Sequence, residues 1–133
     1  MSEQATRRKL GWLAIISMAG GLLLAFFGVR YLLLPELSAV TFGVPRRPAG
    51  HELYYIVGLR NVWLGLLAVA LATLRQWRAL ALWFAIGTIV CFADAAIVAT
   101  STGKLPQVAF HIGGGIAFAV LAVTLWRVAA RHT

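Results

Sequence analysis

The chain has 133 residues, of which 61% are hydrophobic and 12% are charged, about half the charged share of an ordinary soluble domain. This composition excludes a soluble fold of this size and indicates a single membrane-embedded domain over residues 1–133. The single cysteine, Cys91, excludes an internal disulfide and a Cys-x-x-Cys redox pair. The net charge of +8 does not indicate a nucleic-acid partner, because the basic residues stand at the ends of apolar runs and form no nucleic-acid-reading motif.

Four apolar runs follow one another along the chain and predict transmembrane helices over residues 10–34, 53–74, 79–100 and 108–126. Each run approaches or exceeds the ~20 residues that cross ~30 Å of hydrocarbon. The predicted fold class is therefore all-α, a polytopic membrane protein built as a four-transmembrane-helix bundle.

The first run carries small residues at helical spacing, which predict close packing against a neighbouring helix: Ser17, Gly20, Gly21 and Gly28. Pro35 is expected to end this helix. Residues 35–50, with three prolines and two glycines, are predicted to form the longest loop. A loop of this length acts either as a plain connector or as a lid over a pocket.

The charged flanks predict the orientation, because cytoplasmic loops carry an excess of Lys and Arg. With the N-terminus inside, the inner side carries Arg7, Arg8, Lys9, Arg75, Arg78, Arg127 and Arg131. The outer side then carries Arg46, Arg47 and Lys104, with Arg30 near that interface. We expect a multi-pass protein of the cell membrane with both termini in the cytoplasm. The triplet Thr6-Arg7-Arg8 is only faintly similar to a twin-arginine export signal, and a cytoplasmic flank is the better interpretation.

The second run opens on the densest polar motif of the chain, ELYYIVGLRNVWLG at residues 52–65. A charge inside hydrocarbon is costly unless a partner meets it, so Arg60 predicts partners on the other runs. At ~1.5 Å per helical residue, Asp94 and His111 both fall in the same outer half of the bilayer as Arg60. The inner half holds only small polar groups. We therefore expect a polar pocket in the outer half with an apolar plug below it, which disfavours a channel or a pump.

Arg60 and Asp94 are predicted to form an ion pair, either structural or functional, because removing one charge would strand the other in a low dielectric. Catalytic roles are assigned to Asp94, His111, Arg60 and Glu52, and ligand-binding roles to Tyr54, Tyr55, Asn61 and Arg30. A metal site is disfavoured, because no metal-ligand spacing occurs and Arg60 would repel a cation. No phosphate loop or nucleophile motif occurs, so we expect no cofactor.

The motif Tyr54-Tyr55, Gly58-x-Arg60-Asn61-x-x-x-Gly65, followed by Asp94 and His111, resembles a family of small four-span membrane proteins. That family is described as a domain of unknown function and is loosely related to the DoxX-like group. The resemblance covers most of the chain, from the first span onwards. It implies a four-helix membrane bundle and matches Arg60, Asn61, Asp94 and His111 to the family's polar positions. It implies no activity.

Three hypotheses of function follow from this pattern. In the first, the pocket binds a lipophilic small molecule or transforms it by cofactor-free acid–base chemistry such as isomerisation, cyclisation or epoxide opening. In the second, the protein is a non-catalytic membrane subunit whose buried charges are structural. In the third, it is a small-solute transporter that acts as an oligomer. Whether the protein is an enzyme stays open. The expected partners are the membrane, lipids or another lipophilic molecule, and a second copy of the chain, joined through the glycines of the first and fourth runs.

Overall fold

The computed structural model describes residues 3–45 and 50–130 of the chain. Regular structure in this part is entirely helical, with four long helices and one short one: α1 Glu3–Leu33, α2 Pro35–Phe42, α3 Glu52–Thr73, α4 Trp77–Ser101 and α5 Leu105–Ala129. Arg8–Leu33 within α1, and the whole of α3, α4 and α5, are long and apolar enough to cross a membrane. The predicted all-α, four-span membrane bundle is therefore confirmed. The single-domain division stays a prediction.

Residues 35–50 are not a simple loop as predicted, because they begin with the short helix α2. Pro35 ends α1 and also starts α2, since its fixed φ suits a first helical position and its missing N–H would have no partner there. Gly43 ends α2 with a φ of 108°, a left-handed conformation that favours glycine. Residues 46–49, including the basic pair Arg46 and Arg47, lie outside the described part of the chain.

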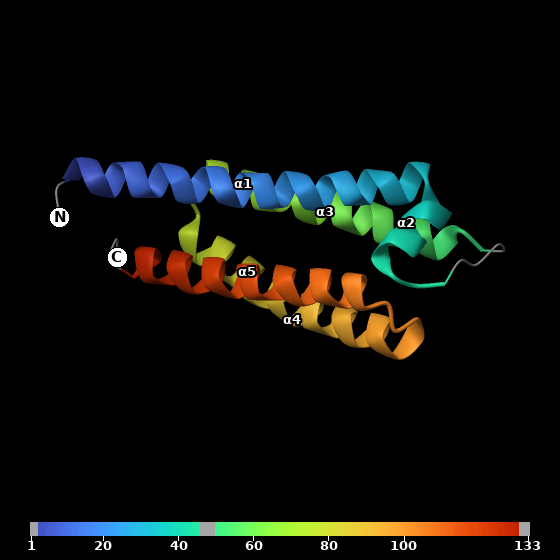
Figure 1. The fold of residues 1–133 in the computed structure, drawn as a ribbon. Helices are drawn as coiled ribbons and strands as arrows, with labels where there is room; N and C mark the ends of the chain where they lie inside the picture. Colours follow the sequence, from blue (N-terminus) through green and yellow to red (C-terminus); the bar gives the residue numbers. More distant parts are fainter. Residues whose placement is uncertain (1–2, 46–49, 131–133) are drawn as a thin grey trace.

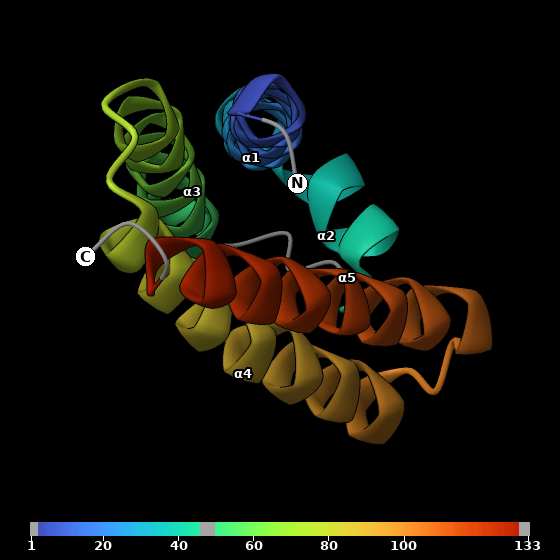
Figure 2. The same ribbon diagram turned by 90° about the vertical axis from the view of Figure 1, so that its left-hand side faces the viewer.

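The long helices form two antiparallel pairs, α1 with α3 and α4 with α5, which pack along their lengths (Figure 1). Contacts between the two pairs are few, and in the view along α1 the α4–α5 pair runs obliquely below the α1–α3 pair (Figure 2). One end of the fold holds the start of α1, the α3–α4 turn and the end of α5, and we call it the terminal end. The opposite end holds α2 and the α4–α5 turn, and we call it the α2 end.

Glycines set the distance between α1 and α3. A Cβ atom added to Gly21 would lie 2.7 Å from the carbonyl oxygen of Gly65, and one added to Gly28 would lie 2.6 Å from that of Gly58. Gly21 and Gly28 are seven residues apart on α1, and Gly58 and Gly65 are seven residues apart on α3. The two helix backbones therefore touch at two points along one face. The predicted close-packing role of the first span is confirmed for Gly21 and Gly28.

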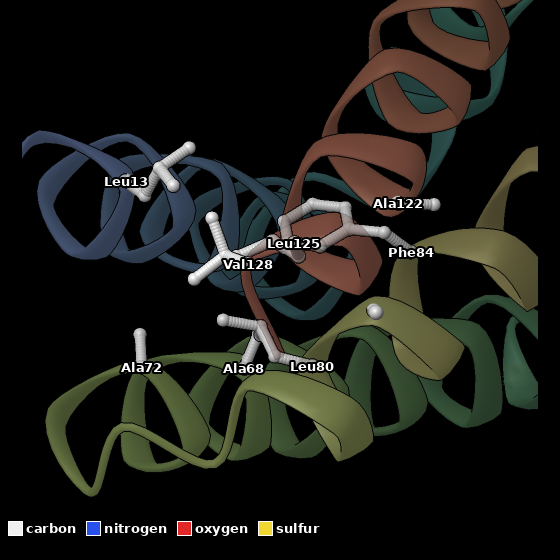
Figure 3. Packing of buried hydrophobic residues seen from close by; sticks show 9 residues of the cluster. Leu13, Ala68, Ala72, Leu80, Phe84, Ala122, Leu125 and Val128 are labelled. Carbon is white, nitrogen blue, oxygen red and sulfur yellow. The ribbon is translucent and has the colours of Figure 1, made fainter. Parts of the chain in front are cut away.

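The main apolar core lies toward the terminal end, where all four long helices meet. Leu13 from α1, Ala72 from α3, Leu80 from α4 and Leu125 from α5 belong to this cluster, and their side chains converge in Figure 3. Phe84, which is fully buried, packs edge-on against Phe118 of α5. This cluster is what holds the two helix pairs together.

Large apolar side chains cover the outside of the fold. Ile89 is 70% exposed and Leu105 is 78% exposed, and only 22% of the residues in the most apolar window of each span are buried. Water would penalise each such side chain by roughly 1.5–3 kcal/mol relative to burial. The surrounding solvent is therefore lipid, and the protein is a multi-pass membrane protein.

Candidate functional site

The polar residues singled out by the sequence gather around a tyrosine pair at the α2 end. Tyr31, in the last turn of α1, and Tyr54, in the first turn of α3, are both buried, and their ring centroids lie 6.2 Å apart. They form a small cluster with Ala39 of α2, which is fully buried. This cluster places the tyrosines directly against the short helix.

Helix α2 is held to α1 and α3 by side-chain contacts. Arg30 of α1 donates to the Thr41 hydroxyl at 3.4 Å. Tyr54 of α3 donates to the carbonyl oxygen of Pro45 at 3.4 Å. His51 Nε2 lies 3.3 Å from Glu36 Oε1, so a histidine beside α3 pairs with the acid in the first turn of α2. The predicted ligand-binding residues Arg30 and Tyr54 therefore both have partners on or just after α2.

The other helix pair holds α2 by its carboxyl end. His111 of α5 lies with Nε2 3.0 Å from the carbonyl oxygen of Phe42, so this nitrogen carries the proton and donates. Thr102, just after α4, donates to the carbonyl oxygen of Gly43. The last carbonyls of a helix have no partner within it, so these two side chains complete the carboxyl end of α2. Helix α2 thus straps the two pairs together where they otherwise stand apart.

Charged groups surround Tyr31 without pairing directly. Asp94 of α4 lies within electrostatic range of His111 and Arg60, and Tyr31 lies within range of Asp94 and Arg60. Residues from four helices therefore share one polar region. The region joins the two helix pairs, so its groups come from segments far apart in the sequence.

The predicted Arg60–Asp94 ion pair is not seen. Within residues 3–45 and 50–130, the structure has an ion pair between His51 and Glu36 and none between Arg60 and Asp94. The physical reason is the packing, because α3 and α4 meet at the terminal end and diverge toward α2 (Figure 1). Arg60 is exposed and Asp94 is half-buried. We call the zone between the two helix pairs at the α2 end the seam.

Three further predicted residues lie at the edge of this region. Glu52 is exposed in the first turn of α3, and Tyr55 is 42% exposed, with its ring 6.3 Å from that of His51. Asn61 is half-buried on α3. Among the described residues, no group of three or more His, Cys, Asp or Glu side chains is arranged to hold a metal ion.

Sequence reasoning missed the residue at the centre, Tyr31. Its signal was present, because a tyrosine beside Arg30 in the last turn of a span stands at the same level as Tyr54. It also missed Ser38 of α2, whose side chain is only 4% exposed and whose hydroxyl has no hydrogen-bond partner among the described residues. Ser38 lay in the predicted loop, where no burial was expected.

A surface cavity of about 380 Å³ lies nearby but apart from this region. It is open, and it sits at the corner between α1 and α2. Its lining consists of Leu33, Leu34, Pro35, Glu36, Leu37 and His51. It contains none of the predicted site residues, and the seam with the charged groups is the better candidate site.

Comparison with known proteins places the chain in a family. The family described as Domain of unknown function (DUF4267) matches residues 21–125. The chain belongs to this family. No curated protein and no solved structure matches it. Every candidate residue from Arg30 to His111, with Tyr31 among them, lies within the part matched by DUF4267. The expected membership of a family of small four-span proteins of unknown function is thus confirmed.

The hydrogen bond from His111 to the carboxyl end of α2 predicts a loss of stability when His111 is replaced. His111→Leu should lower the free energy of unfolding by about 1–3 kcal/mol, because the Phe42 carbonyl would stay buried without its donor. His111→Gln should recover part of this loss, since its amide N–H reaches in the same direction. Thermal unfolding in mild detergent measures both. Equal losses for the two variants would show that the ring, which packs 4.4 Å from that of Phe42, matters and the hydrogen bond does not.

Proposed function

We propose that the seam beneath α2 holds the polar head of a lipophilic small molecule, with its apolar part lying between the helix pairs. The observation that carries this proposal is Tyr31. Its side chain is only 7% exposed, and it lies within electrostatic range of Asp94, Arg30 and Arg60. A ligand that hydrogen-bonds to the Tyr31 hydroxyl would be stabilised there by about 0.5–1.5 kcal/mol.

The charges around Tyr31 favour a head group that accepts hydrogen bonds. Arg30 and Arg60 carry two positive charges against the single negative charge of Asp94, and all three interact with Tyr31. A carbonyl or epoxide group beside a hydroxyl group that donates to Asp94 suits this balance. Apolar surroundings support a lipophilic tail, because Phe27 of α1 and Phe110 of α5 lie across the seam with ring centroids 6.2 Å apart.

The same arrangement supports acid–base chemistry without a cofactor. Asp94 would move the proton, and Tyr31 or Arg60 would stabilise an oxygen that gains negative charge. His111 donates from Nε2 to the Phe42 carbonyl oxygen, so Nδ1 is the atom of this ring that would assist a proton transfer. Glu52, which is exposed at the rim, is the weaker candidate for a catalytic carboxylate.

One observation favours the second function, a non-catalytic membrane subunit. His111 and Thr102 are both engaged in holding α2, so two polar groups of the α4–α5 pair already have structural partners. In that case the molecule in the seam would be a structural lipid. The comparison with DUF4267 favours neither function, because that family is described without an activity.

We place the protein in the cell membrane with both termini in the cytoplasm. The excess of basic residues at the terminal end, where Arg75 and Arg127 are exposed, supports this orientation. The glycines of the first span give less reason to expect a homodimer, because Gly21 and Gly28 already contact α3 of the same chain. Gly113, with nothing within 4 Å of a built Cβ, is the glycine left open to a second copy.

Tyr31→Phe tests the proposed site. The variant should fold as stably as the parent, because it keeps the buried ring and removes only the hydroxyl. Occupancy by the co-purifying lipophilic molecule should fall about two- to tenfold, as expected for one hydrogen bond. Native mass spectrometry of protein purified in mild detergent measures occupancy directly. Thr73→Val is the control, because it removes an exposed hydroxyl near the terminal end of α3, far from the seam. A parent protein without any bound molecule, or equal occupancy in both variants, would refute the proposal.

A further inference from the structure

The terminal end of the fold carries a ring of exposed cations. Arg8 and Lys9 on α1, Arg75 in the α3–α4 turn and Arg127 on α5 are all exposed. Each lies within about one helical turn of a residue in the apolar core that joins the four helices, such as Leu13 for Lys9. The cations therefore stand at one level around one end of the bundle, although they come from three separate parts of the chain.

Tryptophans mark the same level from the membrane side. Trp12 is 58% exposed beside Leu13, and Trp126 is 53% exposed beside Leu125. Trp77, at the start of α4, packs against the same core cluster. Tryptophan side chains concentrate at the boundary between acyl chains and head groups. The cations just beyond them therefore lie among the lipid head groups.

Acidic residues are few at this end. Of the four in the chain, Glu36, Glu52 and Asp94 lie in the half of the fold toward α2, and only Glu3, at the start of α1, lies at the terminal end. Each Lys or Arg at this level attracts anionic lipid, and the attraction decays within a Debye length. Four cations set around one end of a narrow bundle fit several phosphate groups of neighbouring lipids.

The conformation of Arg75 gives a second, independent reason. Arg75 has a φ of 54°, the only positive φ of a non-glycine residue in the described part of the chain. It occupies the position after a helix where glycine is usual, because Gln76 N–H bonds to the Leu71 carbonyl at 2.9 Å and Arg75 N–H to that of Ala72 at 3.1 Å. A Cβ atom is unfavourable in this conformation. An arginine that keeps its place there at a cost to stability points to a role for its side chain.

We infer that the terminal end is a binding site for anionic phospholipid head groups, with Arg75 and Arg127 as its principal ligands. The site is separate from the seam beneath α2, and its occupants are the lipids of one leaflet. Anionic lipids are typical of the cytoplasmic leaflet. The site therefore gives a physical reason for the proposed orientation.

The test uses the full chain in mild detergent, with phosphatidylglycerol or phosphatidylcholine added and thermal unfolding as the readout. Phosphatidylglycerol should raise the unfolding temperature more than phosphatidylcholine, and added salt should weaken this difference. Arg75→Gly and Arg127→Gln should each raise the phosphatidylglycerol concentration needed for half of the effect about fivefold. In phosphatidylcholine alone, Arg75→Gly should be at least as stable as the parent, because glycine adopts the turn without a Cβ atom.

Lys104→Gln is the matched control, since it removes one exposed cation from the α4–α5 turn at the opposite end of the fold. It should leave the response to phosphatidylglycerol unchanged. Equal shifts with both lipids would overturn the inference, as would a loss for Lys104→Gln as large as that for Arg75→Gly. A soluble polyanion such as heparin serves as a further control. If heparin raised the unfolding temperature as much as phosphatidylglycerol does, the inference would also be overturned, because the site would then recognise charge and not lipid.

Discussion

Gly28→Leu is expected to separate α1 from α3 and to lower the free energy of unfolding by about 3 kcal/mol or more. Overpacking typically costs about 1–3 kcal/mol when side chains can shift. Here the new Cβ would meet the backbone oxygen of Gly58 at 2.6 Å and the backbone nitrogen of Val62 at 2.7 Å. Backbone atoms of a packed helix cannot move aside independently, so the whole α1–α3 contact must open. Unfolding of the purified protein in detergent, followed by circular dichroism, measures the loss.

Gly113→Leu is the matched control for this substitution. Gly113 is also a helical glycine in a membrane span, but nothing lies within 4 Å of its built Cβ. Leucine forms helices more readily than glycine, so this variant should be as stable as the parent or slightly more stable. If Gly113→Leu were as damaging as Gly28→Leu, helix–helix contact would not be the reason for the loss at Gly28.

Asp94→Asn is expected to raise the stability of the ligand-free protein by about 1 kcal/mol while reducing occupancy of the seam at least tenfold. Asp94 lies beyond the midpoint of α4, so its charge costs less than the ~2.5–3.5 kcal/mol of an aspartate at the centre of a membrane helix, and Asn removes part of that cost while keeping a polar amide. No ion pair with a described residue compensates the charge of Asp94. Hydrogen bonds to charged groups contribute about 1.5–3 kcal/mol, so a ligand that uses this carboxylate would lose most of its affinity. Thermal unfolding and native mass spectrometry on the same samples measure the two effects.

Arg60→Gln and the double variant show whether the two charges ever meet. Because the structure has no direct contact between them, the changes in unfolding free energy should add to within about 0.5 kcal/mol. A coupling energy of 1 kcal/mol or more would reveal a direct pair that the ligand-free structure lacks. A loss of stability in Asp94→Asn would show that the carboxylate is structural, and the seam would then lose its main candidate for proton transfer.

A substitution that raises folding stability and weakens ligand binding indicates a functional residue, because binding sites often lower the stability of the fold. Asp94 and Tyr31 are alike in their surroundings. Both are at least half-buried, and neither makes a direct hydrogen bond or ion pair with another described residue. His111 differs, because its hydrogen bond to Phe42 already explains its burial. The same comparison would therefore distinguish the residues of the proposed ligand site from residues that stabilise the fold.

The sequence alone determined the solvent, the fold class and the spans, because these depend on local properties. The length and apolarity of a run decide whether it crosses hydrocarbon, and the predicted runs match the observed helices to within about three residues at their ends, apart from the start of α1. The small-residue strip of the first run likewise predicted close packing. Its partner, the heptad of Gly58 and Gly65, was visible in the sequence as a motif but not as a contact.

Only the tertiary structure decided which polar groups meet. Depth along each helix was predictable from ~1.5 Å per residue, but rotation about the helix and separation between helices were not. Arg60 and Asp94 share a depth and still do not touch, because glycine contacts bind α3 to α1 while α4 binds α5. Helix α2 was not predicted, because it has eight residues in a segment rich in proline and glycine. Eight residues are too few to show the hydrophobic periodicity of a helix. Its burial depends on hydrogen bonds from His111 and Thr102, which lie about 60 to 70 residues further along the chain.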